Sequence, residues 1–409
     1  MSPQTINTGM HKITFYYDIV CPYAYIASQR IEALAARSGA TVDWTPVLLG
    51  SIYKSIEAPQ VPSSTWSAAK ARLGALDLHR QARYHRVPLR FPTTHPRRTV
   101  SAMRLLVGAS GPARVALSHA LYQAYWVEGL DISDRSVLNA IAINHGVDPA
   151  CIDSPRARAA LFKTTEQAVA AGAFGVPSMV VDGVLWWGQD RLNLVERAIS
   201  GRRPPESPSL SRGGSLRFFH DFSSPFSYLA STQIARIAAR NGVEVEWLPI
   251  LLGGLFRSIG TPDVPLLTMS AAKQAYVRRD LSDWADWWGV PFSFPTTFPV
   301  RTVLPLRISI AEPAATPHLY RALWAEDRDI GSPEVVTAVL TEAGLDAAAL
   351  IRQASDPDVK AALRANTEAA ETAGVCGVPT VEVGGELIWG QDRLEQVDAA
   401  LSGLWSTLP

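Results

Sequence analysis

The chain is poor in cysteine, and this scarcity excludes several classes of protein. Its 409 residues include only three cysteines, Cys21, Cys151 and Cys376, which lie far apart in the sequence. An odd number at such wide spacing argues against a disulfide framework and against a zinc site. We therefore expect no bound metal and a reducing, cytoplasmic location.

An excess of charge of either sign is also missing. The sequence has 38 basic and 38 acidic residues, with no run of one sign, so we expect neither a nucleic-acid partner nor an anionic surface. No stretch of about 18 consecutive apolar residues occurs, which predicts no transmembrane helix and no membrane partner. The segment 1–11 is polar and lacks the apolar core of a signal peptide, so we expect a short disordered lead there.

A Cys-x-x-Cys motif is absent as well, although the segment that would carry it occurs twice. The first copy reads Asp-Ile-Val-Cys-Pro-Tyr-Ala-Tyr over residues 18–25, and the second reads Asp-Phe-Ser-Ser-Pro-Phe-Ser-Tyr over residues 221–228. Cys21 thus matches Ser224, and Ala24 and Ser227 stand where a redox motif has its second cysteine. What the copies share indicates a common fold and site, and what they change indicates a division of labour.

The parallels continue almost to the end of the chain and define its domains. The matching segments are 42–50 with 245–253, 91–94 with 294–297, 98–100 with 301–303, 175–177 with 377–379, and 188–192 with 390–394. A period near 200 residues indicates a domain duplication rather than a solenoid. We expect domains at 12–200 and 215–405, joined by a linker at 201–214 that is rich in proline, glycine and serine.

Each copy has the same expected order of elements. Short β-prone runs at 12–17 and 216–220 precede helices that begin at Pro22 and Pro225 and end at Gly39 and Gly242. The later elements are second strands at 41–48 and 244–251, helical inserts at 51–165 and 254–367, strands at 178–181 and 380–383, their antiparallel partners ending at Trp187 and Trp389, and last helices near Gln189 and Gln391. The order βαβ, helical insert, ββα predicts an α/β fold of two thioredoxin-like domains, each with a helical insertion.

The first helix of each copy begins at the residue most suited to chemistry. Exposed N–H groups and the helix dipole favour an anion there, so we expect the thiol pKa of Cys21 to be lowered. Ser224 stays neutral, but it can donate a hydrogen bond to a thiolate that belongs to another molecule. The alternative is that both residues are only helix N-caps.

Two further motifs give candidate binding residues, each with a structural alternative. The candidates are Val176-Pro177 and Val378-Pro379, which open a strand, and Gln189-Asp190 and Gln391-Asp392, which begin the last helix. The spacing leaves the valine–proline bond open between cis and trans; if it is cis, the valine backbone can pair with an extended ligand. The aspartates are either ordinary caps or carboxylates that bind an ammonium group.

The inserts add lysines and aromatic residues, and one cysteine precedes a candidate loop. Lys70 and Lys273 match in Ser-Ala-Ala-Lys, where a lysine is usually solvated. We expect most of the aromatic residues in the core and some in the lining of an apolar pocket for a flat substrate. Cys376 either faces the second site or is a small buried residue.

Taken together, these motifs resemble the 2-hydroxychromene-2-carboxylate isomerase family, which is close to kappa-class glutathione transferases and more remotely related to DsbA oxidoreductases. The resemblance implies glutathione as the cofactor. The residues that it implicates are Ser224, and by position Cys21, at the glutathione sulfur; Val176 and Val378 at its backbone; Asp190 and Asp392 at its γ-glutamyl end; and Lys70 and Lys273 at its glycine carboxylate. Since the family usually forms homodimers of single domains, the fusion implies an internal pseudo-dimer.

The resemblance therefore implies an isomerase or transferase that uses glutathione, or an equivalent thiol, on an aromatic or quinonoid small molecule. The sequence departs from the family at Cys21 and at Glu57-Ala58 and Gly260-Thr261, where the family often has asparagine. Two alternatives stay open. One is an oxidoreductase or covalent enzyme that works through Cys21, and the other is a protein that binds a small molecule without catalysis.

Overall fold

The computed structural model describes residues 11–202 and 215–403. Of the disordered segment expected over residues 1–11, His11 lies in a strand, and residues 1–10 are outside the described ranges. Residues 203–214 of the linker expected over 201–214, and the last two residues of the expected second domain, are also outside them. None of the helices within the described ranges is long and apolar enough to cross a bilayer. The same ranges contain no group of three histidine, cysteine, aspartate or glutamate side chains placed to hold a metal ion.

The chain folds into two compact units whose limits do not follow the repeat throughout. Within the described ranges, the first unit comprises residues 11–62 and 78–202, and the second comprises residues 63–77 and 215–403. The segment Ser63–Asp77 lies in the insert expected for the first domain, but it belongs to the second unit. The reason is packing, because Leu73 is 3% exposed and lies in a core cluster with residues of the second copy.

The first unit contains a four-stranded mixed sheet. Its strands are β1 (His11–Tyr17), β2 (Ala40–Pro46), β3 (Ser178–Val181) and β4 (Val184–Trp187), in the order β2-β1-β3-β4. β1 pairs with β2 in parallel and with β3 in antiparallel fashion, and β3 and β4 form a hairpin. The left-handed backbone of Asp182 and Gly183 allows the tight hairpin turn. The predicted thioredoxin-like α/β order is confirmed.

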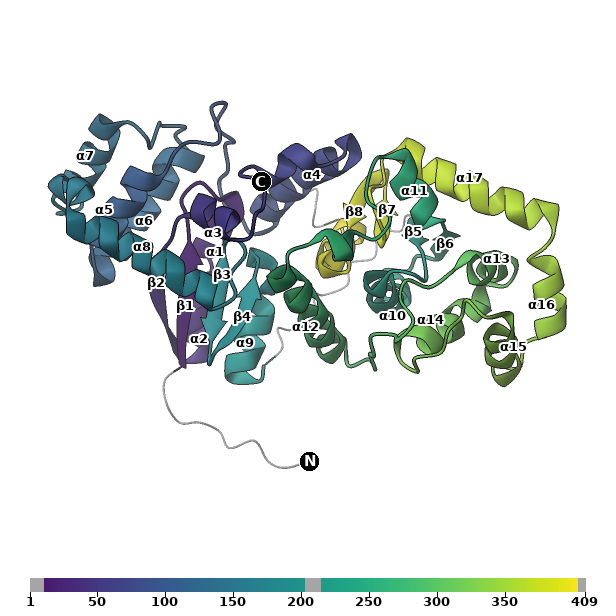
Figure 1. Cartoon of the computed structure of the whole chain (residues 1–409). Helices are drawn as coiled ribbons and strands as arrows, with labels where there is room; N and C mark the ends of the chain where they lie inside the picture. The colour runs from purple at the N-terminus through teal and green to yellow at the C-terminus, as the bar shows by residue number, and fades with distance from the viewer. Residues whose placement is uncertain (1–10, 203–214, 404–409) are drawn as a thin grey trace. The chain divides into compact units, whose positions relative to one another are not determined.

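Helices surround this sheet, and the insert supplies most of them. They are α1 (Pro22–Ser28), α2 (Ile31–Ser38), α3 (Leu49–Ser55), α5 (Val100–Gly108), α6 (Gly111–Trp126), α7 (Arg135–Asn144), α8 (Pro155–Ala170) and α9 (Leu192–Ser200). A further helix of the insert, α4 (Ala68–Tyr84), has residues 68–77 in the second unit and residues 78–84 in the first. Figure 1 shows α5, α6 and α7 grouped beside the edge strand β2. The single helix expected from Pro22 to Gly39 is interrupted at Gln29 and Arg30, where Arg30 donates hydrogen bonds to the backbone and side-chain oxygens of Gln189.

The second unit repeats the sheet with β5 (Leu216–His220), β6 (Val245–Pro249), β7 (Thr380–Val383) and β8 (Glu386–Trp389), in the order β6-β5-β7-β8. Its helices are α10 (Pro225–Arg240), α11 (Leu252–Ser258), α12 (Ala271–Trp288), α13 (Val303–Ala311), α14 (Thr316–Trp324), α15 (Pro333–Glu342), α16 (Ala347–Gln353), α17 (Pro357–Ala373) and α18 (Leu394–Leu401). α13, α14, α15 and α16 gather beside β6 (Figure 1). Here the first helix, α10, is continuous and ends at Arg240, two residues before Gly242.

The largest aromatic residues of the inserts are core residues that support the candidate sites. Trp126 and Trp324 are fully buried. The indole N–H of Trp126 donates to the backbone oxygen of Ile19, and that of Trp324 donates to Phe222, each at 2.8 Å. Since these oxygens lie three residues before Pro22 and Pro225, where the helices begin, each insert fixes the loop that leads into α1 or α10.

Candidate functional site

In the second unit, Ser224 is the N-cap of α10 and also touches the loop that opens β7. Its Oγ accepts a hydrogen bond from the backbone N–H of Ser227 at 3.2 Å and donates one to the carbonyl oxygen of Val378 at 3.1 Å. Pro225 occupies the first helical turn, as the sequence predicts. The hydroxyl is thus oriented between a helix start and a neighbouring backbone oxygen.

Cys21 takes the equivalent place in the first unit but has different chemistry. Its Sγ donates to the carbonyl oxygen of Val176 at 3.1 Å and caps no backbone N–H group of α1. Burial raises its thiol pKa to about 12, although the nearby backbone N–H groups of Ala24 and Tyr23 act in the opposite direction. The expected lowering of this pKa is therefore wrong, because the loss of hydration outweighs the stabilisation from the helix start.

Both valine–proline bonds, Val176–Pro177 and Val378–Pro379, are cis, so the alternative left open by the sequence is decided. The carbonyl oxygen of Pro177 accepts a hydrogen bond from the N–H of Gly188 at 2.9 Å, and Pro379 accepts one from Gly390 at 3.0 Å. Each proline loop is thereby tied to the Gly-Gln-Asp-Arg-Leu segment, and the predicted binding motifs of each copy lie together.

Asp18 and Asp221 hold the loops before the two helices, a role that the sequence analysis missed. The Asp18 carboxylate accepts hydrogen bonds from the N–H of Val20 and of Leu49, and from the hydroxyl of Thr99, at 3.0–3.2 Å. Burial raises its pKa to about 6, and burial also raises the pKa of Asp221, which has the equivalent set of partners. The available signal was the retention of this aspartate and of a matching threonine in both copies.

Most residues of the Gly-Gln-Asp-Arg-Leu segments have a structural role, which is described here for the second copy. Gly390 has φ +111°, and a Cβ there would lie 2.6 Å from an oxygen of Asp392. Gln391 and Leu394 are almost fully buried, and Arg393 forms a bidentate ion pair with Asp77 at 2.7 and 3.0 Å. Retention of the whole motif is therefore largely explained by folding, and a ligand role for Asp190 and Asp392 stays a prediction.

Lys70 and Lys273 both lie in the second unit, although their positions in the repeat predict one lysine in each unit. Lys70 belongs to the second unit, where its Nζ lies 5.1 Å from the ring centre of Trp66 and 5.8 Å from that of Trp389. Burial lowers its pKa, and the neighbouring thiol of Cys376 opposes this shift. The pKa of Lys273 is lowered by burial and by the charge of Lys70, so both ammonium groups influence the same unit.

Cys376 agrees with the alternative of a small buried residue. It is 4% exposed and packs in a core cluster with Leu73, Phe219 and Val378. Burial raises its pKa to about 12, although the positive charge of Lys70 acts against the shift. As a neutral thiol, Cys376 contributes to the apolar wall behind the Val378 loop.

A tyrosine hydroxyl distinguishes the surroundings of Cys21 from those of Ser224. Tyr53 of α3 lies close enough to Cys21 for a thiolate there to raise the tyrosine pKa, although burial is the larger cause. The matching residue of α11 is Phe256, which has no hydroxyl. The first unit thus has a hydroxyl beside its helix-start residue that the second unit lacks, and the sequence signal was this difference between the copies.

The fold and the paired helix-start sites define a protein built from two thioredoxin-like domains in tandem. The sequence profile of the DSBA-like thioredoxin domain matches residues 12–200 and again residues 215–402. The chain therefore belongs to the family of DSBA-like thioredoxin domain proteins, and the predicted family resemblance is confirmed.

Individual relatives agree with this assignment. The chain is 29% identical over 188 residues to 2-hydroxychromene-2-carboxylate isomerase of Sphingobium xenophagum, which covers 45% of this chain and 95% of the relative. It is 27% identical over 202 residues to glutathione s-transferase kappa 2 of Caenorhabditis elegans, covering 44% of this chain and 89% of that protein. A solved structure of a 2-hydroxychromene-2-carboxylate isomerase shares 29% identity, with a TM-score of 0.42 and coverage of 47% of this chain and 96% of that one. The first two relatives are an isomerase and a transferase, which supports an enzyme.

Proposed function

We propose that the protein is a thiol-dependent isomerase or transferase that acts on an aromatic or quinonoid small molecule at the second unit. The observation that carries this proposal is the orientation of Ser224. Its hydroxyl stands at the start of α10 between Ser227 and Val378, where the helix dipole favours a negative charge. A small rotation of the hydroxyl hydrogen redirects its hydrogen bond from the Val378 oxygen to a bound thiolate.

The surrounding groups fit an extended thiol such as glutathione. The side-chain nitrogen of Gln391 is buried and has no hydrogen-bond partner among the described residues. The ammonium of Lys70 lies over two indole rings and forms no ion pair with any described residue. In the proposed complex, Lys70 binds the carboxylate end, Val378 pairs with the peptide backbone, and Asp392 binds the ammonium end.

When bound, the thiol supplies a nucleophile that adds to a conjugated carbonyl compound and leaves again after rotation about the former double bond, without net oxidation or reduction. The role of Ser224 is to stabilise the thiolate by a hydrogen bond, which lowers the pKa of the bound thiol. The apolar wall formed by Leu73, Cys376 and Val378 keeps water from this side of the site. The three free cysteines are consistent with the cytoplasmic location that belongs to the same proposal.

The oxidoreductase alternative receives less support from the first unit. Cys21 is buried and has a raised pKa, whereas a redox or covalent enzyme needs a thiolate near neutral pH. The pseudo-dimer expected from the sequence and binding without catalysis both stay predictions.

Titration of the reduced protein with glutathione in a calorimeter tests the proposal. We expect saturable binding, and we expect Ser224→Ala to lower turnover of an aromatic conjugated substrate by about 10- to 100-fold, the range for one hydrogen bond to a charged group. Cys21→Ser is the matched control in the other copy and should leave this turnover largely intact. An absence of glutathione binding together with unchanged turnover in Ser224→Ala would refute the proposal.

A further inference from the structure

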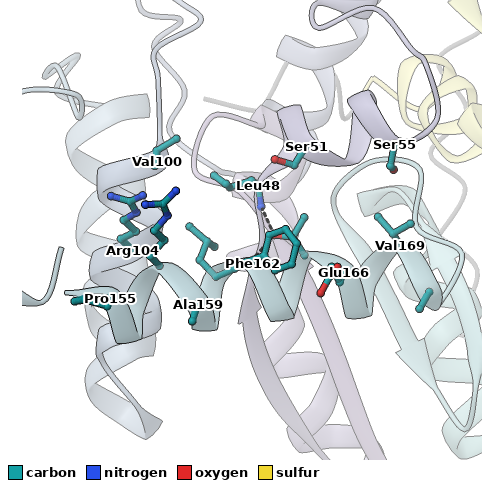
Figure 2. A pocket seen from close by; sticks show the side chains of 14 residues that line it. Leu48, Ser51, Ser55, Val100, Arg104, Pro155, Ala159, Phe162, Glu166 and Val169 are labelled. Atoms are coloured by element: carbon teal, nitrogen blue, oxygen red, sulfur yellow. Dashed lines mark hydrogen bonds between the residues drawn. The ribbon is translucent and has the colours of Figure 1, made fainter. Parts of the chain in front are cut away.

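The first unit contains a cavity of about 790 Å³ that is bordered by α3, α5 and α8. This size lies within the range of small-molecule sites. Figure 2 shows the side chains of α8 along its floor, with Leu48 and Ser51 above them. None of the lining residues belongs to the groups placed around Cys21 or Ser224.

The middle of the cavity is apolar, and its most conspicuous residue is exposed. Phe162 of α8 is 63% exposed and lies in the centre of the lining (Figure 2). Leu48, Val100 and Val169 add further apolar side chains to the same cavity. An open phenylalanine in a cavity of this size indicates a surface that is covered in function, because exposed apolar area of this kind is unfavourable in water.

The second copy provides an internal comparison. α8 aligns with α17 without a gap, so that Phe162 and Val169 correspond to Arg364 and Glu371. The second copy thus has an ordinary charged helix face at these positions. Leu48 and Val100 correspond to Leu251 and Val303 and stay apolar, so Phe162 and Val169 are the apolar lining residues that the first unit has and the second lacks.

One end of the cavity carries positive charge that is not neutralised. Arg104 of α5 and Arg158 of α8 both line the cavity, and within residues 11–202 and 215–403 neither guanidinium forms a hydrogen bond or an ion pair. Figure 2 shows Arg104 near Pro155, at the N-terminal end of α8, and Arg158 precedes Phe162 by one helical turn. Glu166 is the acidic residue of the lining, and it lies on the other side of Phe162.

We propose that this cavity binds an amphipathic organic monoanion, with its carboxylate between Arg104 and Arg158 and its hydrocarbon body over Phe162 towards Val169. Two guanidinium groups without partners match a carboxylate in charge and in hydrogen-bond geometry. Glu166 disfavours a second negative charge at the far end, so a dianion binds less well. This site is separate from the thiol site of the second unit and does not depend on it.

Fluorescence titration of the full chain with 2-naphthoate tests the proposal, with the neutral 2-naphthylmethanol as the comparison ligand. We expect 2-naphthoate to bind about tenfold or more tightly than the alcohol, and Arg158→Gln to remove most of this difference. Phe162→Arg, which introduces the residue of the second copy, should weaken 2-naphthoate by a similar factor. Because Arg158 and Phe162 are both exposed, both variants should fold, which far-UV circular dichroism checks.

Arg364→Phe is the matched control in the second copy and should leave 2-naphthoate affinity unchanged. Equal affinity for the acid and the alcohol, or unchanged affinity in Phe162→Arg, would overturn the proposal. Self-association of the chain that disappears in Phe162→Arg, measured by sedimentation, would instead assign this surface to a second copy of the protein. Failure of glutathione binding at the second unit would leave the 2-naphthoate result intact, so the two proposals are tested independently.

Discussion

Alkylation of Cys21 in the folded protein should be slow, and the structure gives the size of the effect. Burial raises the thiol pKa from 9.0 to about 12. At pH 8, such a thiol has about a thousandfold less thiolate than one with an ordinary pKa. The greater intrinsic nucleophilicity of a more basic thiolate recovers about 20-fold of this loss, which leaves a rate about 50-fold below that of an unperturbed thiol.

Iodoacetamide labelling followed by peptide mass spectrometry measures this rate at each cysteine. Cys151 is partly exposed and is the internal reference, although burial also raises its pKa. We expect Cys151 to react first, and Cys21 and Cys376 to react much later. In urea, where the chain is unfolded, all three cysteines should react at similar rates.

Rapid modification of Cys21 near pH 6.5, at a rate equal to or above that of Cys151, would refute this reasoning. Such a result would mean that the N–H groups at the start of α1 outweigh burial. It would also restore the alternative in which Cys21 acts as a covalent or redox nucleophile. If Cys21 reacts slowly but Cys376 reacts fast, the expectation for Cys376 is wrong and that for Cys21 stands.

Three further outcomes concern stability and are measured by urea unfolding. Leu73→Ala should cost about 2–4 kcal/mol, because Leu73 is 3% exposed in the core of the second unit. Asp77→Asn should cost about 1–3 kcal/mol through loss of the partly exposed ion pair with Arg393. The pKa of Asp18 is raised from 3.8 to about 6 in the folded state, so the folded protein retains a proton that the unfolded chain releases. The free energy of unfolding should therefore fall by up to about 3 kcal/mol as the pH rises from about 4 to 6. In Asp18→Asn this dependence on pH should be absent.

The sequence predicts the sheet of each copy well because the signals there are local. The strands at 178–181 and 380–383 begin directly after proline and end at turns that favour a left-handed backbone. Pro225 and Ser224 mark the start of α10 by capping preferences that depend only on neighbouring residues. Such preferences need no knowledge of distant contacts, and the structure agrees with them.

Features that depend on tertiary packing could not be obtained in this way. Helical periodicity identifies Leu73 as a core residue, but it does not tell which of two similar cores receives it. The helix start at Cys21 is visible in the sequence, whereas the burial that dominates its pKa is set by the surrounding fold. The Asp18 carboxylate binds the N–H of Leu49, 31 residues away, and backbone donors leave no mark on the sequence.

The two copies differ at side chains of both candidate sites, and they agree at groups that hold the backbone. Asp18 and Asp221 bind matching N–H groups, and both valine–proline bonds are cis. Cys21 is replaced by Ser224, however, and Phe162 and Val169 of the cavity are replaced by the charged Arg364 and Glu371. Since these differences alter hydrogen bonding and charge without altering the scaffold, we infer that the two units bind different ligands. A thiol that binds at Ser224 should therefore bind the first unit more weakly, which per-unit affinities in Ser224→Ala and Cys21→Ser would measure.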